Sequence, residues 1–104
     1  MDTPTFDRDH YPPGDWTSWT ATGAEAWRML GYVAGVRIRI DVFTATGYSL
    51  KTEYRWEIAR LAGDATLLRS GSTNTLAKAM AEIHDALWDV YDAAARLMRA
   101  HRST

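Results

Sequence analysis

The stretch from Thr75 to His101 constrains the fold most, because its residues follow the pattern of one long amphipathic helix. Apolar residues recur at alternating steps of four and three, which is helical spacing. At about 100° per residue they share one narrow stripe, which we expect to pack on the core. The residues of this core stripe are Leu76, Met80, Ile83, Leu87, Val90, Ala94, Leu97 and His101.

A second, partly aromatic stripe runs beside the core stripe on the same predicted helix. Its residues are Ala77, His84, Trp88, Tyr91 and Ala95. A helix of this length spans about 40 Å at ~1.5 Å per residue, whereas a strand of roughly eight residues spans about 26 Å. The helix should therefore extend beyond any sheet that it packs on, and its second stripe needs a further cover. Either the N-terminal segment or another subunit provides that cover.

Three antiparallel strands are predicted before this helix. Val36–Phe43 and Tyr54–Leu61 alternate between apolar and charged residues, which is the pattern of half-buried strands, and Thr66–Ser70 follows as a short third strand. Gly63-Asp64 fits a two-residue hairpin turn with glycine in first place. Residues 71–74 should end the sheet and supply the helix N-cap. The predicted class is α+β, with a three- or four-stranded antiparallel sheet packed on one long C-terminal helix.

Residues 16–33 fit two different secondary structures. Thr22-Gly23-Ala24-Glu25 has the spacing of a capping box, which favours a short helix that runs to Leu30. The alternation of Trp27, Met29 and Val33 suits a strand equally well. We favour the helix slightly, because the capping box marks a helix start.

The first fifteen residues contain three prolines and show no periodicity, so we expect a flexible or draped arm. Phe6, Tyr11 and Trp16 are the side chains that would hold this arm on the second stripe. Residues 16–104 then form a single domain, which is the expected number for a chain of 104 residues.

Composition excludes several classes of protein. A hydrophobic content of 46% with five tryptophans indicates a folded chain, and a net charge of −1 gives no overall attraction to nucleic acid or acidic lipid. The absence of cysteine excludes disulfides, thiolate zinc sites and thiol catalysis. No apolar run approaches ~18 residues and no signal-peptide pattern opens the chain, so a cytoplasmic protein is expected. Arginine outnumbers lysine ten to two, a bias typical of a GC-rich genome such as that of an actinobacterium or its phages.

With a helix in residues 16–33, the element order resembles that of the double-stranded-RNA-binding domain, most closely over residues 54–87. In that family the last helix opens with a serine-lysine-lysine-x-alanine-lysine motif, whose lysines contact phosphates across a groove. The matching positions are Thr73, Asn74, Thr75, Leu76, Ala77 and Lys78. The alanine and the final lysine are kept, while the first two lysines are replaced. The resemblance therefore implies the topology more than the binding chemistry. The order of elements also resembles the style of small orphan proteins of actinobacteria and their phages.

Arginines on the predicted outer face of the sheet are candidate phosphate contacts. Arg37, Arg39 and Arg55 should lie together there if the first two strands pair, and Lys78 would add a fourth positive charge from the helix. Asp41 shares that face, as does Glu57, so cross-strand ion pairing explains the arginines as well. We favour the ion-paired interpretation.

No combination of residues predicts catalysis, a cofactor or a metal site. No Gly-x-Ser-x-Gly elbow, phosphate-binding glycine loop or dinucleotide fingerprint is present, and no two histidines share a helical face near a carboxylate. Asp85, Asp89 and Asp92 form an acidic column, but one helix face offers fewer oxygen ligands than dedicated cation sites use. We expect a protein that is not an enzyme.

The sequence thus favours a non-catalytic protein-interaction module that acts through the second stripe, at Trp88, Tyr91, His84 and Ala95. Tryptophan and tyrosine anchor many interfaces because they bury a large area at low entropic cost. The partner would be another protein, such as a host factor bound by a phage or accessory protein, or a second copy in a homodimer. The alternative function is a nucleic-acid-binding domain of modified double-stranded-RNA-binding type.

Overall fold

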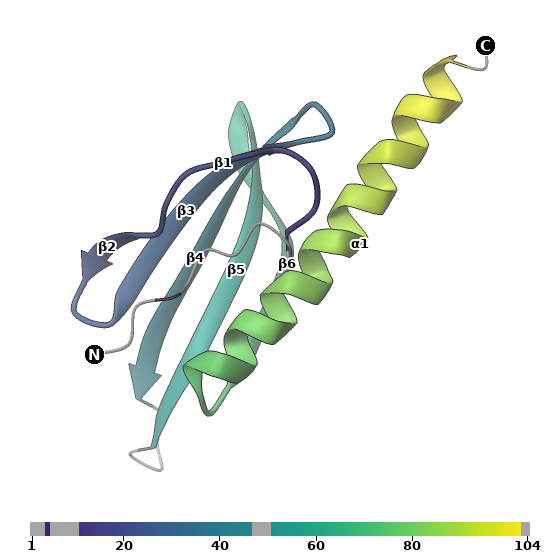
Figure 1. The fold of residues 1–104 in the computed structure, drawn as a ribbon. Coiled ribbons are helices and arrows are strands. Elements are labelled where there is room, and N and C mark those ends of the chain that lie inside the picture. The colour runs from purple at the N-terminus through teal and green to yellow at the C-terminus, as the bar shows by residue number, and fades with distance from the viewer. Residues whose placement is uncertain (1–3, 5–10, 47–50, 103–104) are drawn as a thin grey trace.

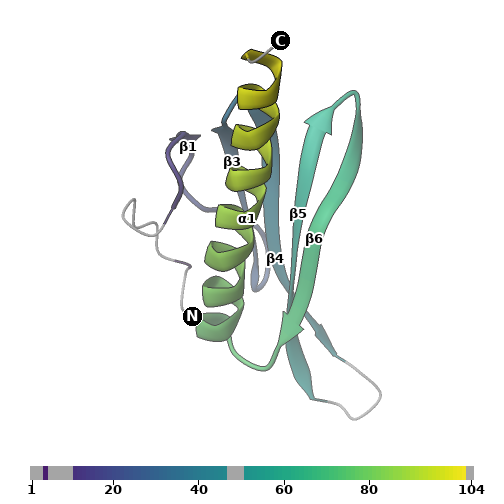
Figure 2. The same cartoon turned by 90° about the vertical axis from the view of Figure 1, so that its right-hand side faces the viewer.

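The computed structural model describes residue 4, residues 11–46 and residues 51–102. Its described residues form one antiparallel sheet with a single long helix on one face (Figures 1 and 2). The strands are β1 (Asp15–Trp16), β2 (Thr20–Gly23), β3 (Ala26–Val33), β4 (Val36–Thr46), β5 (Thr52–Ala62) and β6 (Asp64–Thr73), and the helix is α1 (Leu76–Arg102). The α+β class is confirmed, but the sheet has six strands rather than the three or four expected. Phe6 and most of the predicted arm lie outside the described residues.

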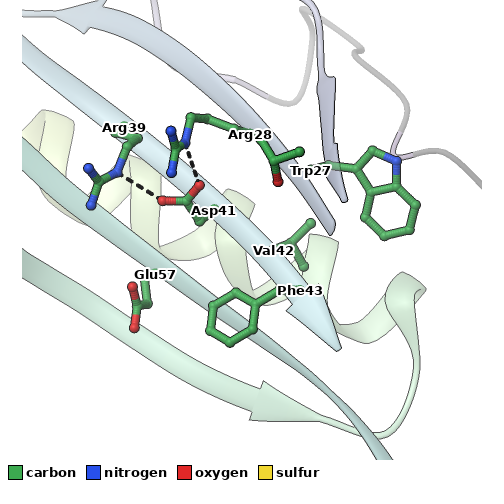
Figure 3. A pocket seen from close by; sticks show the side chains of 8 residues that line it. Trp27, Arg28, Arg39, Asp41, Val42, Phe43 and Glu57 are labelled. Atoms are coloured by element: carbon green, nitrogen blue, oxygen red, sulfur yellow. Dashed lines mark hydrogen bonds and ion pairs between the residues drawn. The ribbon is translucent and has the colours of Figure 1, made fainter. Parts of the chain in front are cut away.

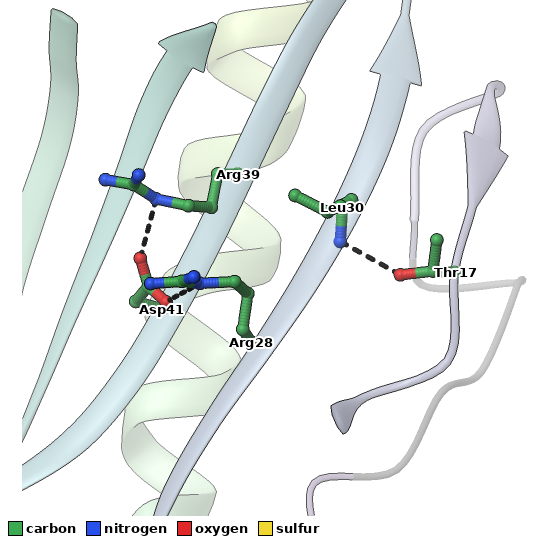
Figure 4. Close-up of polar contacts among 5 residues, drawn as sticks. All are labelled: Thr17, Arg28, Leu30, Arg39 and Asp41. Atoms are coloured by element: carbon green, nitrogen blue, oxygen red, sulfur yellow. Dashed lines mark hydrogen bonds and ion pairs between the residues drawn. The ribbon is translucent and has the colours of Figure 1, made fainter. Parts of the chain in front are cut away.

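The sheet is a meander in which β3, β4, β5 and β6 pair in chain order. Both β1 and β2 pair with β3, so together they form one interrupted edge strand. Thr17 joins the two pieces: its N–H donates to the carbonyl of Leu30, and its Oγ1 accepts a hydrogen bond from the N–H of Leu30, each at 2.9 Å (Figure 4). A side-chain oxygen thus replaces the missing backbone acceptor where the edge strand is interrupted.

The helix predicted near the start of the chain is wrong, because residues 26–33 form a strand. Gly23 pairs with Ala26 across a tight turn in which Glu25 has a φ of 53°, so the residues of the apparent capping box form a hairpin. The alternating side chains of Trp27, Met29 and Val33 are buried. β3 pairs with β4 along its whole length, and this ladder outweighs a local capping preference of about 1 kcal/mol.

One face of the sheet packs on α1 and forms the core with it. The fully buried large side chains come from alternate positions of the central strands and from the predicted helix stripe; they include Met29, Ile38, Ile40, Val42, Ile58, Ile83 and Leu87. The helix begins where expected: Thr75 Oγ1 accepts a hydrogen bond from the N–H of Lys78 at 3.2 Å and caps the first turn. Residues 71–73 do not end the sheet as predicted, since β6 stays paired with β5 as far as Thr73.

The β5–β6 hairpin turns where predicted but more tightly. Ala62 pairs with Asp64, which leaves Gly63 at the tip with a φ of 77°. Glycine adopts this left-handed conformation without steric cost. The pairing register then shifts by one residue opposite Ile58 and Ala59, so Leu68 forms a bulge in β6.

The C-terminal turns of α1 project beyond the strand ends (Figure 1), in an elongated molecule of 54 × 26 × 23 Å. Leu97 lies on the core stripe, yet it is 65% exposed. The expected overhang of the helix is therefore present, and it opens part of the core stripe as well as the second stripe.

Candidate functional site

The predicted second stripe forms the outer flank of α1, which we define as His84, Trp88, Tyr91 and Ala95. Trp88 is 40% exposed, and the other three residues are partly buried. The rings of Trp88 and Tyr91 meet edge to face, with centroids 5.7 Å apart and planes at 82°. The fold thus brings the four predicted partner-binding residues to one side of the helix, and Trp88 is the most exposed of them.

The N-terminal segment covers one end of the outer flank. The ring of Tyr11 is buried and meets His84 edge to face at a centroid distance of 4.7 Å. Trp16 packs against Tyr11 at 5.2 Å, and the Nε1–H of Trp19 donates to the Tyr11 hydroxyl at 3.3 Å. The chain therefore supplies its own cover near His84 and leaves Trp88 partly exposed.

The face of the sheet that points away from α1, here called the open face, carries a cluster of paired charges. Arg28 Nε donates a hydrogen bond to Asp41 Oδ1 at 2.7 Å, and Arg39 Nε lies 2.8 Å from Asp41 Oδ2 in an ion pair (Figures 3 and 4). The carboxylate between them is only 14% exposed. Because one acid serves two guanidinium groups and Glu57 stands directly across from it, positive charge is largely balanced here.

A shallow hollow of about 320 Å³ surrounds this cluster (Figure 3). Its lining residues are Thr22, Trp27, Arg28, Arg39, Asp41, Val42, Phe43 and Glu57. The nearest arginines already contact a carboxylate, so an incoming phosphate would have to displace Asp41. The geometry favours a structural role for these charges, as the sequence indicated.

The four predicted phosphate contacts do not form one surface. Arg37 and Arg39 lie two residues apart on β4, and Arg55 on β5 points to the same open face. Arg55 Nε lies 3.6 Å from Glu53 Oε2. Lys78 is exposed on α1, which packs on the opposite face of the sheet. A nucleic-acid surface would therefore rest on the arginines alone.

A second concave surface, which we call the α1/β6 groove, lies between the C-terminal half of α1 and the β5–β6 hairpin. It has a volume of about 140 Å³ and is mostly apolar. Its lining residues are Val36, Arg60, Leu68, Arg69, Val90, Ala93, Ala94 and Leu97. Sequence reasoning missed this groove because it assigned Leu97 to the core. The relevant signal was the length of the helix, which already required its last turns to leave the sheet.

The described residues contain no group of three or more His, Asp or Glu side chains placed to hold a metal ion. Within the same residues, α1 is too polar to be a candidate membrane-crossing helix. The chain matches no protein-family model, no curated protein and no solved structure.

Proposed function

We propose that this protein is a non-catalytic protein-interaction module and that the outer flank of α1 binds its partner. The observation that carries the proposal is the exposure of Trp88 beside Tyr91 on a helix that projects past its sheet. The partner is a protein that offers an apolar pocket or groove. The excess of arginine over lysine is typical of actinobacteria and their phages. We therefore expect this chain to be a phage-encoded or accessory protein and its partner to be a host factor.

The chemistry of the outer flank supports protein binding over small-molecule binding. Its aromatic pair lies on a long helix, with Ala95 one turn from Tyr91 to allow close approach of a partner backbone. Partly exposed aromatic rings that are already positioned lose little side-chain entropy on binding. An acidic column at Asp85 and Asp92 borders the flank, so a partner with basic residues around an apolar pocket would fit best.

A capture experiment tests this proposal. The purified protein and its Trp88→Ala and Ala95→Arg variants are immobilised and exposed to an actinobacterial lysate, with Leu67→Ala as a matched control. Leu67 is exposed on β6, away from the outer flank. Proteins that bind the wild type and the control but neither flank variant would support the outer flank as the site. An identical set of captured proteins for all four baits would refute it.

Nucleic-acid binding is the second candidate function, and the shared face of Arg37, Arg39 and Arg55 is the observation that favours it. Asp41 is the residue that limits it, because its carboxylate neutralises two arginines. Binding of duplex RNA and DNA is measured at two salt concentrations for the wild type and Asp41→Asn. Phosphate contacts must weaken steeply with salt, and the variant should bind more tightly than the wild type. No binding by either protein at low salt eliminates this candidate.

A further inference from the structure

The α1/β6 groove exposes apolar residues that the other described residues of the chain leave uncovered. Val90 and Ala94 are buried in its floor, while Ala93 and Leu97 are exposed at its mouth. Leu97 lies on the same stripe as the fully buried Leu87, yet it is 65% exposed near the C-terminal end of α1. An apolar side chain from another molecule could pack against Leu97 and fill the groove.

We propose that a second copy of this chain occupies the groove. The α1 helices of the two copies cross in antiparallel directions about a two-fold axis near Ala93. Each Leu97 then enters the groove of the other copy, next to Leu68 and Val90. An interface of this kind is self-complementary, because the groove and the side chain that fills it belong to the same surface.

The charges on α1 fit an antiparallel crossing of two copies. Asp89 and Arg96 are seven residues apart and therefore share one side of the helix, with Ala93 about midway between them. Both are exposed, and within the described part of the chain neither takes part in an ion pair. Antiparallel helices that cross at Ala93 bring Asp89 of each copy beside Arg96 of the other, which makes two symmetric ion pairs. A parallel crossing in register would instead oppose like charges.

The proposed dimer surface is separate from the outer flank. Trp88 and Leu97 are nine residues apart, which places them on opposite sides of α1 at about 100° per residue. A dimer formed through the groove would leave Trp88 available to a different protein. A substitution in one of these two surfaces should therefore leave binding at the other unchanged.

Sedimentation over a range of protein concentrations gives the first test. The wild type should shift from monomer towards dimer as concentration rises, and Leu97→Glu should remain monomeric with an unchanged circular dichroism spectrum. The matched control is Leu67→Glu, which changes another exposed leucine and should leave the dimer intact. A wild type that stays monomeric at high micromolar concentration overturns the proposal, as does a dimer that Leu97→Glu leaves unchanged.

Exchange of charge tests the orientation of the helices. Asp89→Arg and Arg96→Asp should each weaken self-association, because each places like charges across the crossing. An equimolar mixture of the two variants should form a heterodimer in which both ion pairs are restored. If the mixture stays as weakly associated as the separate variants, the antiparallel crossing is wrong.

A cysteine substitution tests the position of the two-fold axis, and the natural chain has no cysteine to interfere. Ala93→Cys should form a disulfide-linked dimer under mild oxidation, because a residue at the axis lies close to its own copy. Ala81→Cys changes another exposed alanine of α1 and should stay unlinked. Equal cross-linking of both variants, or none in Ala93→Cys, would place the contact elsewhere.

Discussion

The Nε1–H of Trp56 donates a hydrogen bond to Oε1 of Glu82 at 2.9 Å, and this bond joins the sheet to the helix across twenty-six positions of sequence. Trp56 is buried in the middle of β5, so its indole N–H has little access to water. Glu82 is an exposed residue of α1, and this bond gives it a structural role. The bond helps to set the position of α1 on the sheet.

Removal of either partner should destabilise the protein. We expect Glu82→Ala to lower the free energy of unfolding by about 1–2 kcal/mol, since it leaves a buried donor without its acceptor. Glu82→Gln keeps an acceptor oxygen and should cost less. A double-mutant cycle with Trp56→Phe, measured by urea denaturation, should give a coupling energy of about 1 kcal/mol. A coupling energy near zero would mean that the bond contributes nothing to stability.

The indole ring of Trp56 leaves no room for a side chain at Gly71. It pairs with Trp56 across β5 and β6, and a Cβ at position 71 would stand 2.6 Å from the indole. We expect Gly71→Ala to destabilise the fold by about 1–3 kcal/mol and to displace the ring from Glu82. Ser70→Ala, one residue earlier and exposed, is the control and should change stability by less than about 0.5 kcal/mol. Tryptophan fluorescence and thermal unfolding together report both effects.

The β3–β4 turn can be improved. Ala34 and Gly35 both have positive φ, at 49° and 80°, so they form a type I′ turn between Val33 and Val36. Alanine is strained in this conformation, whereas asparagine tolerates it. Ala34→Asn should raise the free energy of unfolding by about 0.5–1 kcal/mol. Ala34→Val should lower it, because a β-branched side chain is worse there. The opposite order in chemical denaturation would contradict the turn assignment.

Adjacent residues on α1 should differ sharply in their contribution to stability. Leu87 is fully buried, so Leu87→Ala should cost about 2–5 kcal/mol through lost burial and a cavity. Trp88, although larger, is 40% exposed, and we expect Trp88→Ala to cost less than about 1.5 kcal/mol. Equilibrium unfolding of both variants makes the comparison. A larger loss for Trp88→Ala would identify that ring as core and remove the basis of the proposed outer flank.

Local periodicity was enough to predict the elements whose residues repeat regularly. The helix from residue 76 onwards and the strands around Ile40 and Trp56 are where the pattern placed them, because alternate burial at periods of 3.6 and 2 leaves few other folds. The grouping of Trp88 with Tyr91, and of Arg37, Arg39 and Arg55, followed from the same periods.

The other features depend on contacts between elements that lie far apart in the sequence. Residues 26–33 carry both a capping signal and a strand pattern, and the backbone ladder with β4 resolved that conflict in favour of the strand. Glu82 lies outside both apolar stripes of the helix, so the sequence gives no sign of its structural role. Only the packing of β5 against α1 brings the indole of Trp56 within hydrogen-bonding distance of it. The α1/β6 groove likewise exists only where a helix longer than its sheet separates from β6, since a sequence specifies the period of an element but not where its neighbours end.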